Sequence, residues 1–157
     1  MWRFNLDGFV LHTLRDDLTR QCYTQLFRDG GIEVMRGSVL AKDGQRSGFY
    51  VWGMEDAVIS RFANYSRFWS HIGVTPPLLI ALTLSGVQGW KVLRGPYSHL
   101  DREAAFDRDV VMPPEVIMLD LQLRPMWSCG PLFDFIWNGG GWPASPNYRE
   151  GRWVKPQ

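Results

Sequence analysis

The chain has 157 residues, the length of a typical single domain, and its 45% hydrophobic and 21% charged residues exclude a disordered protein. A formal net charge of +1 excludes a strongly basic nucleic-acid-binding protein but leaves a local basic patch open. The N-terminus lacks the apolar segment of a signal peptide, and the longest apolar run, residues 76–84, is too short to cross a bilayer. We therefore expect a cytoplasmic protein.

The basic residues are mainly arginine, fourteen of the 17. A genome rich in G and C explains such a bias most simply, although arginine also binds phosphate and stacks on aromatic rings. The two cysteines, Cys22 and Cys129, have no zinc-binding spacing. We expect thiols in a reducing compartment and no bound metal or cofactor.

The N-terminal third predicts strands. Residues 3–14 mix apolar residues with turn formers and indicate a strand with a turn. Alternating residues on both sides of the turn at 29–31 predict a β-hairpin over 21–40. A short aromatic strand is expected at 48–52.

The clearest helix is predicted over residues 54–72. Its apolar residues at 58, 62, 65, 69 and 72 step by three and four, which is typical of an amphipathic helix with one buried face. Gly73 stands where a C-terminal cap belongs, and prolines 76 and 77 prevent continuation.

Beyond this helix, residues 78–84 predict a buried strand, and further strands are expected at 90–93 and 116–119. A final helix is predicted from about Pro131 to residues 138–139. Glycines 139–141 follow that helix, whereas a phosphate-binding glycine loop precedes one, so we interpret them as a helix cap and exit.

These elements predict an α+β fold in a single domain over residues 1–157. We expect a mixed or antiparallel sheet with one long amphipathic helix packed on it and a short C-terminal helix. Residues 139–157 are expected to form an aromatic tail that docks on the body.

Three kinds of site are considered from the residues, and a small-ligand sensor pocket in the sheet is a fourth that the sequence neither supports nor excludes. The leading hypothesis is a non-catalytic domain that binds a protein partner or self-associates, because Trp and Arg are abundant and no active site is readable. Its candidate anchors are Trp127, Trp142 and Trp153.

The second hypothesis is direct nucleic-acid binding through Arg61, Asn64 and Arg67 on the polar side of the long helix. A solvated helix face is the commoner outcome for such residues.

The third hypothesis is a metal-dependent phosphoesterase or nuclease. Its weak candidates are His99, Asp107 and Asp109, which lie in a polar stretch that we otherwise interpret as a solvated loop. We lean towards a protein that is not an enzyme.

An ordered series of segments adds a resemblance. The segments are RFNLDG (3–8), YTQLFRDGGIEV (23–34), GVTPPLLIALTLSGVQG (73–89), DRDVVMPPEV (107–116) and PLFDFIWNGGGWPASPNYREGRW (131–153). The series resembles the C-terminal region of bacterial proteins with a Schlafen AlbA-type putative DNA-binding domain, which are often labelled helix-turn-helix, transcriptional-regulator or ATP-binding proteins. The AlbA-type domain itself is absent, so no site residue carries over. The resemblance implies an accessory module of a nucleic-acid-linked regulatory or phage-defence system.

Overall fold

The computed structural model describes residues 1–14, 20–37, 40–43, 46–93, 104–121 and 128–155. Helices and strands are both present, which confirms the α+β class. The chain divides into two compact units, Met1–Val39 and Leu40–Gln157. The single domain expected over 1–157 stays a prediction.

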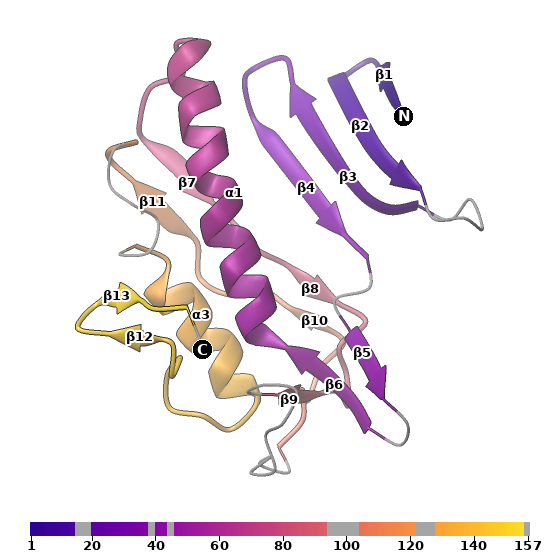
Figure 1. The fold of residues 1–157 in the computed structure, drawn as a ribbon, viewed down its shortest axis with the longest axis vertical. Coiled ribbons are helices and arrows are strands. Elements are labelled where there is room, and N and C mark those ends of the chain that lie inside the picture. Colours follow the sequence, from indigo (N-terminus) through magenta and orange to yellow (C-terminus); the bar gives the residue numbers. More distant parts are fainter. Residues whose placement is uncertain (15–19, 38–39, 44–45, 94–103, 122–127, 156–157) are drawn as a thin grey trace. The chain divides into compact units, whose positions relative to one another are not determined.

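The first unit is a four-stranded antiparallel meander in the order β1-β2-β3-β4 (Figure 1). Its strands are β1 (Trp2–Phe4), β2 (Gly8–Leu14), β3 (Arg20–Phe27) and β4 (Ile32–Arg36). The strand with a turn near the N-terminus and the hairpin around residues 29–31 are therefore both confirmed. The Asp29 carboxylate closes the hairpin turn by accepting the Gly31 N–H at 2.8 Å.

The second unit combines two helices with short strands in its described part. Its elements are β5 (Leu40–Asp43), β6 (Arg46–Tyr50), α1 (Val51–His71), β7 (Leu78–Ile80), β8 (Leu84–Ser85), β9 (Lys91–Leu93), β10 (Val110–Val111), β11 (Val116–Met118), α3 (Gly130–Gly139), β12 (Tyr148–Arg149) and β13 (Arg152–Trp153). β6 pairs antiparallel with β5 and parallel with β9, which makes a mixed three-stranded sheet. The pairs β7–β11, β8–β10 and β12–β13 are antiparallel.

Helix α1 begins three residues before the predicted start, directly after β6. Its C-terminus matches the prediction: Gly73 adopts φ 78°, and the Val74 N–H bonds to the Trp69 carbonyl at 2.9 Å, as in a Schellman motif. The predicted buried stripe is displaced, because Ile72 is 44% exposed. The fully buried side of α1 instead runs along its first half, and its members are Val51, Met54, Glu55, Ile59 and Phe62.

The predicted single buried strand over residues 78–84 is wrong in two respects. The segment forms two short strands, β7 and β8, and Leu79 between the ends of β7 is 62% exposed. Leu79 lies opposite Ile117, which is 63% exposed, so this cross-strand pair faces outward. On the other side of this ladder Met118, opposite Leu78, is buried, and in the separate β8–β10 pair Leu84 is buried.

The glycines at the end of α3 cap the helix, as predicted: Gly139 is its last residue, and Gly140 and Gly141 follow it. Gly141 adopts φ 77°, its N–H bonds to the Asn138 carbonyl at 2.8 Å, and the Trp142 N–H bonds to the Trp137 carbonyl at 3.0 Å. These two bonds complete a Schellman motif. Gly140 is required for a different reason, which is space: a Cβ at Gly140 would lie 2.4 Å from the Val92 Cβ.

We expect Gly140→Ala to lower the free energy of unfolding by about 2 kcal/mol, because the added methyl group overpacks the contact with Val92. Gly53→Ala is the matched control: nothing lies within 4 Å of its Cβ position, and Gly53 lies inside α1. Alanine there should raise stability by about 0.5–1 kcal/mol. Urea unfolding followed by circular dichroism measures both, and equal effects would contradict the packing argument.

Candidate functional site

A fully buried carboxylate lies at the centre of the second unit. Glu55, on α1, has 0% exposure, although a glutamate is almost never fully buried without partners. This residue was not singled out from the sequence, where the buried side of the helix was assigned from apolar residues alone. Its burial therefore requires polar partners from other parts of the chain.

Four hydrogen-bond donors surround the Glu55 carboxylate. Its Oε1 accepts the Trp137 indole N–H at 2.7 Å and the Ser145 hydroxyl at 2.8 Å. Its Oε2 accepts the Asn147 side-chain amide at 2.5 Å and the Trp153 indole N–H at 2.8 Å. Two donors on each oxygen match the acceptor capacity of an ionised carboxylate. Charge-assisted hydrogen bonds from neutral groups, rather than an ion pair, thus compensate its desolvation.

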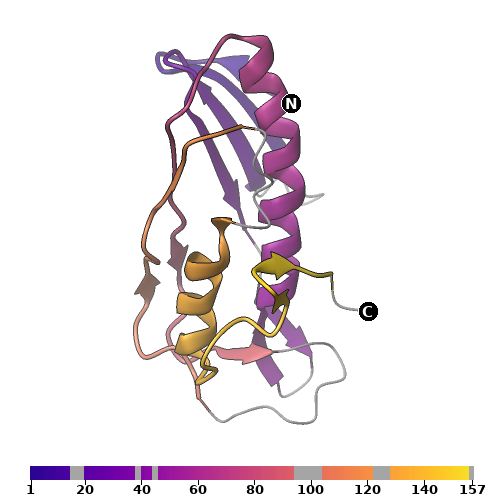
Figure 2. The ribbon, with the colours of Figure 1, turned by 90° about the vertical axis from the view of Figure 1, so that its left-hand side faces the viewer.

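These bonds connect segments that are far apart in the sequence. Trp137 lies on α3, Ser145 and Asn147 lie in the following loop, and Trp153 lies on β13. Both views show the β12–β13 hairpin beside α1 and α3 (Figures 1 and 2). The Asp134 carboxylate on α3 adds a bond from the Ser145 backbone N–H at 2.8 Å. The Glu55 carboxylate therefore fixes the C-terminal segment to both helices.

The β12–β13 hairpin places two of the donors. Its two-residue turn, Glu150–Gly151, has φ values of 51° and 74°, as a type I′ turn requires. Tyr148 lies opposite Trp153 in the ladder, and the Val154 N–H bonds to the Asn147 carbonyl at 2.7 Å. The turn thereby brings the Asn147 amide and the Trp153 indole to the same carboxylate oxygen.

The groups beside this network do not form a nucleophilic site. Burial raises the pKa of the Cys129 thiol to about 11, so it is protonated near neutral pH. Burial, followed by the charges of Cys129, Glu55 and Asp134, raises the pKa of the Tyr148 hydroxyl. Glu55 has no exposed surface through which a substrate could reach it. The arrangement holds the fold together and offers no reacting group to solvent.

The candidate tryptophan anchors have different positions. Trp153 is 7% exposed and bonds to Glu55, so it belongs to the chain's own core. Trp142 is half-buried, with its ring 5.8 Å from that of Trp137 in an edge-to-face contact. Trp127 lies outside the described residues.

The candidate phosphoesterase residues are not assembled in the described part of the chain. Asp107 receives two hydrogen bonds from the Arg108 guanidinium, at 2.8 and 3.1 Å, and these bonds lower its pKa. Asp109 is exposed, and His99 lies outside the described residues. Among the residues whose positions are described, no three His, Cys, Asp or Glu side chains are grouped to hold a metal ion.

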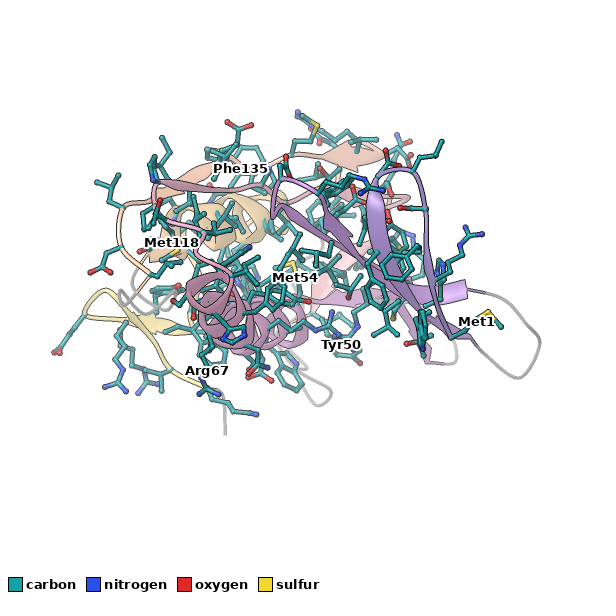
Figure 3. The ribbon with its side chains drawn as sticks, turned by 90° about the horizontal axis from the view of Figure 1, so that it is seen from above. Met1, Tyr50, Met54, Arg67, Met118 and Phe135 are labelled. Atoms are coloured by element: carbon teal, nitrogen blue, oxygen red, sulfur yellow. The ribbon has the colours of Figure 1, made fainter. Side chains whose placement is uncertain are left out.

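The candidate nucleic-acid residues share one side of α1. Asn64 and Arg67 are exposed, and Arg61 is half-buried. Figure 3 shows Arg67 on the outer side of the helix. The last fifteen residues of α1 contain no acidic side chain, so this side is locally basic.

A surface that the sequence analysis missed lies on the first unit. The register places seven apolar side chains on one side of the meander, which we call the aromatic face: Trp2, Phe4, Phe9, Leu11, Leu26, Ile32 and Val34. Trp2, Phe4 and Leu11 are 63%, 74% and 48% exposed. The other four are half-buried, so none is withdrawn from solvent.

The opposite side of the same sheet is more polar and more buried. Gln25 and His12, both on that side, are 6% and 8% exposed. An antiparallel sheet with one solvated side normally exposes its polar side. This sheet instead exposes its apolar side and buries polar residues of the other side. The sequence did contain a signal for this apolar side, because Trp2, Phe4, Phe9 and Leu11 occupy alternate positions along their strands.

The Trp2, Phe4 and Phe9 rings form a cluster on this face. Their centroids lie 5.5–6.2 Å apart, within the range of favourable aromatic pairs. Each ring thus limits the motion of the other two. The cluster presents a pre-ordered apolar surface.

Comparison with protein-family models, curated proteins and solved structures gives no match. Within the described ranges, neither helix combines the length and apolar character needed to cross a bilayer. The resemblance to the Schlafen AlbA-type proteins stays a prediction.

We expect Glu55→Gln to destabilise the protein by about 3 kcal/mol, because the new amide NH₂ group faces donors where the carboxylate accepted bonds. Asp56→Asn is the matched control on the next residue, where a 3.5 Å ion pair with the 66% exposed Lys155 contributes little. Chemical denaturation measures both variants. If the two cost the same, the four-donor network is not the main restraint on the C-terminal segment.

Proposed function

We propose that this chain is a non-catalytic interaction module, which docks another polypeptide on the aromatic face of its first unit. The observation that supports this proposal most strongly is the exposure of Trp2, Phe4 and Leu11 on one sheet face. Large exposed apolar patches on soluble proteins mark interaction sites, and aromatic side chains dominate the energetics of such sites.

The second unit supports the same assignment by its chemistry. Its most prominent buried group, Glu55, has all its acceptor positions filled by the chain's own donors. The thiol of Cys129 is buried and protonated. The module is best placed in a bacterial nucleic-acid-linked regulatory or phage-defence system, the setting implied by the resemblance to Schlafen AlbA-type proteins, and in the cytoplasm.

Site-specific photo-crosslinking tests the proposal. We expect a benzophenone amino acid at position 4 to form a defined protein adduct in a cell that makes the chain natively. The same probe at position 6 is the control, because Leu6 is 93% exposed but lies in the turn after β1. Denaturing electrophoresis and mass spectrometry identify the adducts. If no adduct forms at position 4, or if both positions give the same adducts, the proposal that a polypeptide docks on the aromatic face is refuted.

Direct nucleic-acid binding is the second candidate, favoured by the acid-free stretch of α1 that carries Arg61 and Arg67. On this alternative, replacing both arginines by alanine should weaken binding of short DNA or RNA and reduce the salt slope by about two. Arg149→Ala, on the exposed β12–β13 hairpin, is the control. Fluorescence anisotropy at several salt concentrations measures the effect, and binding that is absent or independent of salt eliminates this candidate.

A further inference from the structure

We infer that the occupant of the aromatic face is a second copy of this chain, packed sheet against sheet. This inference rests on the proposed interaction function and names its partner. It requires that the face be large enough for a stable contact. It also requires that two identical faces meet without an electrostatic penalty.

The area is sufficient for a specific pair. Trp2, Phe4 and Leu11 keep 63%, 74% and 48% of their surface exposed, and the four other members of the face keep smaller fractions. Since an aromatic side chain offers roughly 150–250 Å², the face offers on the order of 500 Å² per copy. Two copies would bury about 1,000 Å² in total, which is the lower bound for a specific interface. We therefore expect a weak, concentration-dependent dimer.

The charges also favour a second copy. The seven members of the aromatic face are uncharged, and the neutral Thr24 lies among them, paired with Leu11 and Val34. Arg36, the last residue of β4, lies on the same side of the sheet but at its margin, one register step beyond Thr24 and Val34. Two such faces meet at uncharged side chains, with Arg36 outside the apolar cluster, and each removes apolar surface of the other from water. The charged residues of the middle registers, Arg3 and Glu33, point to the opposite side of the sheet. A partner of different sequence would need an uncharged face of its own, which a second copy supplies by symmetry.

The geometry is that of ordinary sheet packing. Two antiparallel sheets stack face to face with their inner side chains interdigitating. A four-stranded sheet with an apolar side gains stability once that side is covered by another layer. The ring cluster of Trp2, Phe4 and Phe9 would lie inside such a contact, with little rotamer freedom left to lose on association.

Sedimentation equilibrium on the purified full chain, from about 1 to about 500 µM, tests the inference. We expect the mass to rise with concentration towards twice the 18.1 kDa of the chain. The Phe4→Glu variant should have the monomer mass at every concentration, because a dimer would bury the introduced carboxylates of both copies at the contact. Leu6→Glu should behave as the unaltered chain. Circular dichroism checks that both variants fold, which the exposure of both side chains favours.

Hydroxyl-radical footprinting of the unaltered chain gives a readout that needs no substitution. Trp2, Phe4 and Leu11 should become protected as concentration rises, while Leu79 and Ile117, exposed in the second unit, should not. Protection that appears at Leu79 instead, or a dimer that survives Phe4→Glu, would assign the contact to another surface and overturn the inference.

The remaining outcomes separate this inference from the interaction function. If the chain is a monomer at every concentration and hydroxyl radicals modify Trp2 and Phe4, the proposed dimer is overturned. The interaction module would then bind a different protein partner. A monomer whose Trp2 and Phe4 are protected at every concentration shows that the chain covers its own face. That result overturns both the dimer and the proposed function.

Discussion

The second unit depends on one desolvated negative charge. Glu55 lies on α1 without any exposed surface, and four neutral donors from α3, the following loop and β13 satisfy both of its oxygens. A carboxylate buried in this way is stable only while all of its donors are in place. The position of the C-terminal hairpin is thus determined by hydrogen bonding as well as by apolar packing, and its two-residue turn sets the donors in register.

This constraint separates the roles of the two units. In the second unit, Asp107 pairs with Arg108 and Glu55 pairs with its four donors. The first unit does the reverse, because its meander exposes apolar side chains and withdraws Gln25 and His12. The second unit thus uses buried polar contacts to hold its own segments together, whereas the first unit leaves large apolar side chains exposed.

Local patterns predicted local structure well. The caps at Gly73 and after α3 and the hairpin at residues 29–31 depend on neighbouring residues, and all are confirmed. The presence of helix α1 was also predicted, but its buried side was not, because that side depends on what packs against the helix. Glu55 was missed because its donors lie 82 to 98 residues away, and a charged residue carries no sign that it will be buried. The exposure of Leu79 and of the aromatic face was missed because apolar residues predict burial until tertiary packing decides which side is covered.

The distribution of tryptophan gives the molecule built-in optical reporters. The indoles of Trp137 and Trp153 are buried and held rigidly against a negative charge, whereas the indole of Trp2 lies in water. A rigid buried indole emits at shorter wavelength than a hydrated one and contributes strongly to near-ultraviolet dichroism. Trp2 is the one tryptophan among residues 1–39, so an emission change that disappears in Trp2→Phe would report an event at the first unit. A dichroic change that disappears in Trp153→Phe would report release of the C-terminal segment.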